Sequence, residues 1–238
     1  MNISNIISLL VIFIIIIIIY LVYRYLVTLS NKAYVTNSDD KVFITSPSNA
    51  MIMKTIDYKD LPKSINDTSY SLGLWFYIDG WDYKYQQLKH VLNKGDILNN
   101  QPTIYFDRTK NVLKIKVDVV DGLHEVIEVN DIYMKQWVYL YINFEDTNVN
   151  VFLNGKLVKS HILQSDIQTN TGDIYINKSG GFNGLVTKIM VSNDLKNQED
   201  IAAIYKKGPY SSVFLDFSKK FFKNLSIKFG KILDVCNK

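Results

Sequence analysis

Apolar side chains form a nearly continuous run close to the amino terminus. The run covers residues 6–23, is interrupted only by Ser8 and includes six consecutive isoleucines at Ile14–Ile19. At a helical rise of about 1.5 Å per residue, a helix of this length spans roughly 27 Å, which is close to the hydrocarbon thickness of a bilayer. The pattern therefore predicts a transmembrane helix within residues 1–29, as a single membrane span.

The flanks of this run favour an uncleaved anchor over a cleaved secretory signal, which is the alternative interpretation. No Lys or Arg precedes the run, whereas a signal peptide has a basic amino-terminal region. The run ends in Tyr20, Tyr23 and Arg24, which are too bulky for a cleavage site and typical of a membrane interface. Because basic residues follow the run and none precedes it, the positive-inside tendency favours a cytoplasmic position for the rest of the chain. The single cysteine, Cys236, agrees with a reducing compartment.

After a polar stalk at residues 30–68, with strand character at 41–45 and 50–56, the hydrophobic pattern changes to a period of two. Within 70–78, one set of alternate positions carries large apolar side chains, as expected for a strand with one face in a core: Tyr70, Leu72, Leu74, Phe76 and Ile78. The same alternation recurs along the chain at 103–107, 112–119, 125–129, 137–144, 149–153, 156–161, 173–177 and 185–191. This series predicts an all-β, antiparallel sandwich domain over residues 69–208.

Turn and cap signals separate these predicted strands. Asn154-Gly155 lies between two apolar stretches and predicts a two-residue type I′ hairpin, because both turn positions need positive φ. Near the end of the domain, Asn197 or Asp200 can cap a short helix that Gly208 and Pro209 terminate. We therefore expect one short helix after the last strand.

Strand parity divides the side chains into two sets. One set is apolar and mostly aliphatic, and it is the expected core: Leu72, Leu74, Phe76, Ile104, Phe106, Leu113, Ile115, Val117, Val138, Leu140, Ile142, Ile174 and Ile176. The opposite set is aromatic: Trp75, Tyr77, Tyr105, Trp137, Tyr139, Tyr141 and Tyr175. Such an aromatic face can stack on sugars, contact a partner protein or lie under a flanking segment, and parity does not choose among these.

Several segments in this order resemble a known family. They are 69–78, 90–95, 137–142, 149–158, 181–191 and 198–205. Together they resemble the concanavalin A-like lectin/glucanase superfamily in its laminin-G/pentraxin-like branch. The resemblance implies an antiparallel jelly-roll β-sandwich and recognition of a carbohydrate or protein partner. The heavy use of Ile, Asn, Lys and Tyr is typical of proteins encoded by A/T-rich genomes. In this respect the chain also resembles membrane-anchored members of the family from large DNA viruses, so a virion membrane is one expected location.

Catalytic and metal-binding patterns are not predicted. Glycoside hydrolysis needs two carboxylates facing one cleft, but Glu125 and Glu128 lie three positions apart and point to opposite faces of a strand. The three histidines are scattered. Aspartates near predicted strand ends could supply oxygen ligands for calcium, but they match no ligand spacing, so we expect no metal or cofactor. The modest net charge of +4 has no basic stripe with a recognition motif, so nucleic acid binding is not expected.

The sequence therefore predicts a non-catalytic, membrane-anchored module that binds a glycan or protein partner; the alternative is a scaffold that links a membrane to a protein shell. The candidate ligand-binding residues are Trp81, Tyr83, Tyr85, Trp75, Tyr77, Tyr139 and Tyr141. A last segment, 209–238, carries apolar residues at helical spacing interleaved with lysines. This short amphipathic helix is expected either to lie on an anionic membrane or to cover the sandwich.

Overall fold

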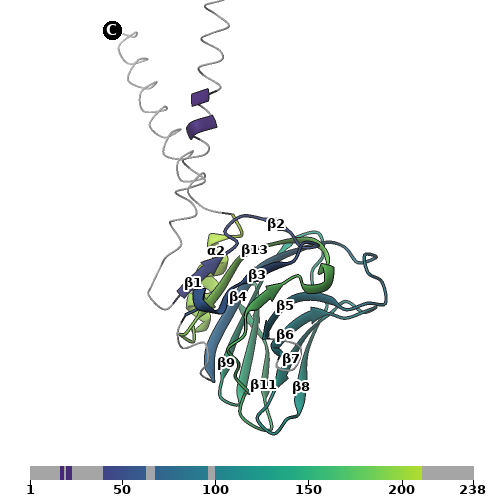
Figure 1. Ribbon diagram of the computed structural model, residues 1–238, viewed down its shortest axis with the longest axis vertical. Helices are drawn as coiled ribbons and strands as arrows, with labels where there is room; N and C mark the ends of the chain where they lie inside the picture. The colour runs from purple at the N-terminus through teal and green to yellow at the C-terminus, as the bar shows by residue number, and fades with distance from the viewer. Residues whose placement is uncertain (1–16, 19, 23–39, 63–67, 96–99, 211–238) are drawn as a thin grey trace, which may run out of the picture. The chain divides into compact units, whose positions relative to one another are not determined.

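The computed structural model describes residues 17–18, 20–22, 40–62, 68–95 and 100–210. The chain divides into two compact units. One unit comprises residues 1–34 and 211–238, and the other comprises residues 35–210. In the first unit the described residues, among them Ile17 and Tyr20, are helical and have exposed side chains. The second unit is a β-sandwich of two antiparallel sheets (Figure 1).

One layer of the sandwich is a seven-stranded sheet with the strand order β1-β13-β4-β9-β10-β11, in which β2 also pairs with β13. Its strands are β1 (Asp40–Phe43), β2 (Ser48–Asn49), β4 (Ser69–Gly80), β9 (Trp137–Glu145), β10 (Asn148–Leu153), β11 (Lys156–Ile162) and β13 (Asn183–Ser192). The long central strand β9 pairs with β4 over the full length of β9, from Ser69 opposite Glu145 to Tyr77 opposite Trp137.

The other layer is a six-stranded sheet with the order β3-β12-β5-β6-β7-β8. Its strands are β3 (Lys54–Ile56), β5 (Lys89–Gly95), β6 (Asn100–Phe106), β7 (Val112–Asp118), β8 (His124–Asn130) and β12 (Ile174–Ile176). Two short 3-10 helices, η1 (Tyr58–Asp60) and η2 (Lys178–Gly180), lie in the connections. The predicted all-β sandwich is thus confirmed.

The core between the sheets includes the side chains that strand parity selects. All thirteen residues of the predicted core set lie in one buried cluster. Burial of apolar surface at about 25 cal/mol per Å² is the main stabilising contribution to such a sandwich. Phe182 joins this cluster from the segment before β13 and packs edge-on against Phe106, with ring centroids 5.1 Å apart.

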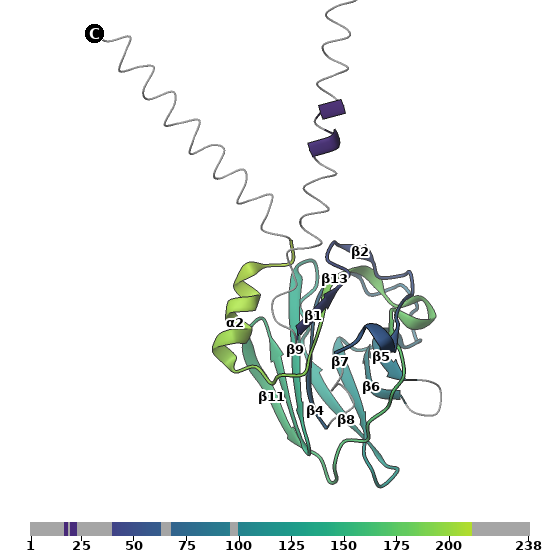
Figure 2. The same ribbon diagram turned by 60° about the vertical axis from the view of Figure 1, so that its left-hand side comes forward.

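The predicted hairpin and helix both form. Asn154 and Gly155 have φ values of 51° and 80°, so both turn residues adopt the left-handed region that the hairpin requires. Helix α2 (Gln198–Lys207) begins at Asn197, whose side chain accepts a hydrogen bond from the Asp200 amide, and it ends at Gly208. Figure 2 shows α2 on the outer side of the seven-stranded sheet, away from the six-stranded sheet.

The predictions for the two ends of the chain lie outside the described residues. These are the anchor within 1–29, apart from five residues, and the amphipathic segment after Tyr210. Among the residues that the structure describes, no helix has both the length and the apolar character needed to cross a bilayer.

Candidate binding site

The outer face of the seven-stranded sheet is closed by α2. Trp75, Tyr139 and Tyr141 are buried in a second cluster, together with Ile201 of the helix. The ring of Trp75 stacks on Tyr205 of α2 at a centroid distance of 5.5 Å. Of the three alternatives for an aromatic face, a flanking segment covers this part of it.

This closure corrects part of the ligand-binding prediction. Trp75, Tyr139 and Tyr141 cannot stack on a ligand because the helix occupies their outer surface. The Tyr141 hydroxyl lies 2.6 Å from Ser71 Oγ, so its polar end is also bound within the protein. Tyr77 is partly exposed and packs against Trp137 at the edge of this cluster, with ring centroids 5.8 Å apart.

The predicted contact loop after β4 serves mainly as a packing element. Trp81 lies edge-on to Phe106 with ring centroids 5.6 Å apart, and the Lys89 amine lies 5.2 Å from the centre of the Trp81 ring. The Tyr83 hydroxyl donates a hydrogen bond to Gly180 O at 3.0 Å, which ties the loop to η2. Tyr85 differs from both because 59% of its surface is exposed.

The outer face of the six-stranded sheet carries the rest of the predicted aromatic set. Register places Tyr105 between His90 and Lys114, in a row that continues to Glu128. A second row across the strands consists of Thr55, Tyr175, Asn93, Thr103, Lys116 and Val126. Tyr105 and Tyr175 are both partly exposed. The Lys178 amine lies over the Tyr175 ring at 5.4 Å from its centre. We call these two rows the polar-aromatic face.

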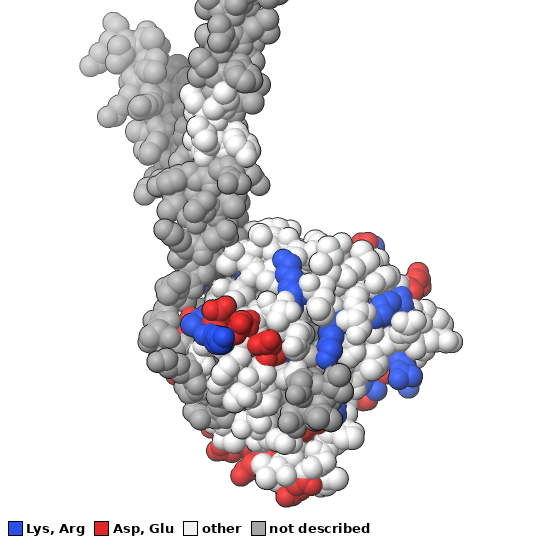
Figure 3. All heavy atoms as spheres, in the orientation of Figure 1, with Lys and Arg blue, Asp and Glu red and all other residues white. Residues whose placement is uncertain are grey.

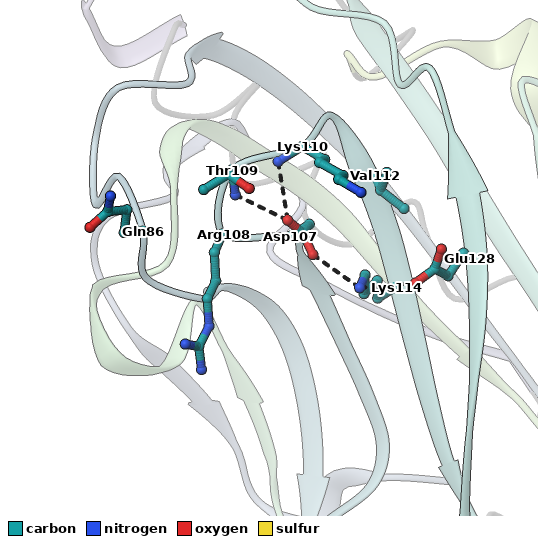
Figure 4. A pocket seen from close by; sticks show the side chains of 8 residues that line it. All are labelled: Gln86, Asp107, Arg108, Thr109, Lys110, Val112, Lys114 and Glu128. Atoms are coloured by element: carbon teal, nitrogen blue, oxygen red, sulfur yellow. Dashed lines mark hydrogen bonds and ion pairs between the residues drawn. The ribbon is translucent and has the colours of Figure 1, made fainter.

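A pocket of about 540 Å³ adjoins this face where β6 turns into β7 (Figure 4). Its walls come from the β6–β7 turn, from Gln86 of the β4–β5 loop and from strands β7 and β8. The lining residues are Gln86, Asp107, Arg108, Thr109, Lys110, Val112, Lys114 and Glu128. Lys114 and Glu128 belong to both the pocket and the first row, so the pocket and the polar-aromatic face form one continuous surface.

Ion pairs fix the floor of this pocket. Lys114 Nζ lies 3.0 Å from Asp107 Oδ2 and 2.9 Å from Glu128 Oε1. The backbone amides of Thr109 and Lys110 donate hydrogen bonds to Asp107, and the Thr109 bond is the main reason that the pKa of this carboxyl is well below its usual value. Hydrogen bonds to Glu128 and Asp107 raise the pKa of Lys114. Asp107 and Lys114 are therefore fully charged near neutral pH.

Two cations of the pocket are available for a ligand. The side chains of Arg108 and Lys110 are exposed and form no hydrogen bond or ion pair with another residue in the described part of the chain. Figure 4 shows that the Arg108 side chain points away from the Asp107–Lys114 pair. The pocket can thus offer donors from Arg108, Lys110 and Gln86 to an oxygen-rich group.

The carboxylates do not form a catalytic pair in the described strands. Glu128 faces outward in the first row, whereas Glu125 faces the other sheet and contacts His161 Nε2 at 2.8 Å. This contact joins the edge strands β8 and β11. Sequence reasoning missed the contact, because it pairs residues from different sheets and no local spacing signals it.

Two of the aspartates near strand ends, which could have supplied calcium ligands, pair with lysines instead. Asp79 pairs with Lys135 at 2.7 Å, Asp107 is bound as described above, and Asp96 lies outside the described residues. Within the described ranges, no three His, Cys, Asp or Glu side chains come together in a way that could hold a metal ion.

Similarity to solved structures extends across the sandwich at low sequence identity. The binding domain of botulinum neurotoxin serotype D has a TM-score of 0.53 at 13% identity, over 71% of this chain and 43% of that one. The serotype G binding domain has a TM-score of 0.52 at 14% identity, over 72% of this chain and 47% of that one. The receptor binding domain of the botulinum neurotoxin C/D mosaic serotype has a TM-score of 0.54 at 12% identity, over 71% of this chain and 45% of that one. This chain therefore spans less than half of each toxin domain, and the likeness concerns the fold.

Sequence comparison defines the family. No curated protein sequence matches this chain. Residues 54–202 match the Laminin_G_3 family, described as the concanavalin A-like lectin/glucanases superfamily. The matched region runs from the first residue of β3 into α2, so it includes most of the sandwich and the first half of the helix that closes its outer face. On this match over more than half of its length, the chain belongs to the concanavalin A-like lectin/glucanases superfamily.

Proposed function

We propose that this protein is a membrane-tethered, non-catalytic recognition module that binds a glycan, either free or carried on a protein, through the polar-aromatic face. The observation that supports the proposal is that a helix covers the aromatic side chains on one outer face, whereas those on the other outer face stay partly exposed. Helix α2 buries Trp75, Tyr139 and Tyr141 on the seven-stranded sheet. On the six-stranded sheet, Tyr105 and Tyr175 keep part of their surface exposed.

The chemistry of this face suits a sugar. A pyranose ring has apolar patches that pack against an aromatic ring, and it has hydroxyls that need hydrogen-bond partners. Tyr105 and Tyr175 supply the rings, and Lys114, Lys116 and Thr55 supply polar groups beside them. The pocket with Arg108 and Lys110 can extend the contact to a second residue of the glycan.

A glycan array probed with the full chain in detergent tests this function. We expect saturable binding that weakens about tenfold in Tyr105→Ala and in Tyr175→Ala, since one lost stacking contact is worth about 1.4 kcal/mol. Tyr133→Ala is the matched control, because Tyr133 is exposed but lies outside the polar-aromatic face. Binding that both variants retain in full would exclude this face, and the absence of saturable binding would exclude the function.

The tether is a separate part of the proposal, and the apolar run at residues 6–23 supports it. A span of this length should keep the protein in the membrane after alkaline carbonate extraction. Release into the carbonate supernatant would remove the tether. Protease protection in sealed vesicles tests the proposed cytoplasmic position of the sandwich. Without detergent, we expect protease to digest the sandwich only when it is added to the cytoplasmic side of the membrane.

A second candidate function is a scaffold that links a membrane, such as that of a virion, to a protein shell. The edge strand β11 favours it, because its outer edge is unpaired in the seven-stranded sheet and Leu157, Val158 and Ile162 are exposed along it. Exposed edge strands are sites of strand addition by a partner. Proximity labelling should then recover a protein partner that is lost with Ile162→Lys and kept with Ser160→Lys. Unchanged recovery with Ile162→Lys would exclude β11 as the contact.

A further inference from the structure

Three consecutive apolar side chains project from the β2–β3 loop. Met51, Ile52 and Met53 are 37%, 58% and 51% exposed, although the next residue on either side is more buried. Runs of three exposed apolar residues are unfavourable in water unless they serve a contact. Neither the polar-aromatic face nor its pocket includes them.

The loop is held rigidly with these side chains outward. Ala50 is buried, its amide donates to Gly184 O at 2.9 Å, and its carbonyl accepts from the Phe182 amide at 3.2 Å. The Met51 amide donates to Asn49 Oδ1 at 2.8 Å, and Asn177 Nδ2 donates to Ile52 O at 3.3 Å. Backbone bonds on both sides of the tip therefore oppose its collapse onto the sandwich.

Lysines surround this tip. Lys54 follows it directly, and Lys178 begins η2, next to Asn177. Lys84 of the β4–β5 loop donates a hydrogen bond to Ser179 O, which joins this loop to η2. Hydrogen bonds thus connect three segments, 50–54, 81–88 and 177–181, into one surface, which we call the upper loop end (top and upper right of the sandwich in Figure 1).

Strand register places Arg108 and Lys110 at the same end. Lys89 at the start of β5 pairs with Phe106 at the end of β6, so the β6–β7 turn lies beside the β4–β5 loop. Gln86 confirms the contact, since its amide donates to Arg108 O at 3.2 Å. Asp82 and Asp131 are exposed carboxylates in this region, whereas Asp79 and Asp107 are paired with lysines. Cationic groups therefore prevail here.

The opposite end of the sandwich is acidic. The turns at that end join β7 to β8 and β9 to β10, and the 163–173 segment is bonded to both. They carry the exposed carboxylates Asp121, Glu145, Asp146 and Asp166. Figure 3 shows Asp and Glu side chains gathered at this lower end. The sandwich thus has a charge polarity along its strands.

The last described residue also lies at the upper loop end. Tyr210 accepts a hydrogen bond from Trp137 Nε1 at 3.0 Å, and Trp137 begins β9 opposite Tyr77, near the end of β4.

We infer that the upper loop end docks on the surface of an anionic bilayer, with Met51, Ile52 and Met53 inserted among the lipids and Lys54, Lys84 and Lys178 at the headgroups. Apolar side chains gain free energy by leaving water, and each lysine near an anionic surface contributes about 1 kcal/mol. The acidic lower end faces away from such a surface. This contact is a second site beside the first: its inserted side chains, Met51, Ile52 and Met53, lie outside the polar-aromatic face, whereas Lys178 borders Tyr175 of that face.

A polarity-sensitive fluorophore on the full chain tests the inference. The label is placed at Ile52→Cys in a Cys236→Ser background, and the protein is reconstituted into phosphatidylcholine vesicles with and without 30% phosphatidylserine, a composition of about that order being enough for a negative surface potential. Leu123→Cys is the matched control, since Leu123 is also 58% exposed but lies in the β7–β8 turn at the lower end.

We expect the label at position 52 to shift to the blue and to be quenched by doxyl lipids in the anionic vesicles, and the label at 123 to stay aqueous. The double variant Lys54→Gln/Lys178→Gln should reduce the shift at least twofold. If the chain sediments with vesicles while the label at 52 remains aqueous, the docking is wrong and the tether stands. If it sediments only with anionic vesicles and the label is buried, the docking stands and the tether is wrong. A chain that binds neither vesicle contradicts both.

Discussion

Gly155 shows how one residue connects the local turn to the tertiary structure. Its φ of 80° suits the type I′ turn, and a Cβ placed there would lie 3.0 Å from the Ala202 Cα of α2. The Asn-Gly signal predicts the first constraint, because it depends only on adjacent residues. The close approach to Ala202 cannot be predicted from the sequence, because it depends on where α2 packs in the folded protein. The same limit applies to Trp75 and Tyr141. Alternation along their strands predicts which face of the sheet they occupy, but it does not predict that α2 covers them.

At the residue scale, we predict that Gly155→Ala lowers the free energy of unfolding more than Gly122→Ala does. Gly122 has a similar φ of 77° but nothing within 4 Å of its added Cβ, so it controls for backbone strain alone. The extra loss for Gly155→Ala should be about 1–3 kcal/mol, as for overpacking in a tight contact. Denaturant unfolding measures the free energy of unfolding of both variants. Equal losses of this free energy would mean that α2 does not pack against the hairpin.

Helix α2 is the element that separates the two outer faces. Its cap, its length and its apolar residues Ile201 and Ile204 follow from the local pattern, so the helix itself is predictable. Most strand positions are predictable from alternation, but β5 is not among the segments that alternation predicts. Pairing is not predictable, because β12 joins β3 to β5 across long stretches of chain. For that reason the sequence could not assign Trp75 to one sheet and Tyr105 to the other, and the candidate site mixed covered and exposed rings.

At the element scale, Ile201→Ala should release α2 from the seven-stranded sheet. Ile201 is fully buried, and removal of such a side chain costs about 2–5 kcal/mol. Tryptophan emission should shift to the red in the native baseline, because Trp75 loses its cover. Lys206→Ala, at an exposed position of the same helix, should change neither quantity. A native spectrum for Ile201→Ala would contradict the packing.

The contact between Glu125 and His161 gives a second prediction at this scale. The Gln164 amide and His161 hold the pKa of Glu125 below its usual value, so the stability from this carboxylate is lost as pH falls through its lowered pKa. His161→Ala should speed hydrogen exchange in β11, by an amount that corresponds to about 1 kcal/mol. His124→Ala, in the exposed first position of β8, should leave that exchange unchanged.

At the scale of the whole molecule, buried lysines and tyrosines set the alkaline stability. Burial lowers the pKa of Lys94 and of Lys188 to about 8. An unfolded chain keeps these protons up to about pH 10.5, so between pH 8 and 10 the unfolded state binds more protons and the free energy of unfolding rises with pH. Burial also raises the pKa of Tyr70, Tyr139 and Tyr141.

Above about pH 10 these tyrosines lose protons only in the unfolded state, so stability should fall again. Guanidinium unfolding followed by near-ultraviolet circular dichroism at pH 7 to 11 should show a maximum near pH 10. Lys94→Met should flatten the rising limb but keep the falling one. A steady decline from pH 8 upward would contradict the burial of both lysines.

The central claim is that one outer face of the sandwich is closed by the protein itself and the other is available for recognition. Hydroxyl-radical footprinting of the full chain, read by mass spectrometry for each aromatic residue, tests it most directly. We predict ready oxidation of Tyr105 and Tyr175 and protection of Trp75, Tyr139 and Tyr141. Oxidation of the second group at the rate of the first would contradict the account.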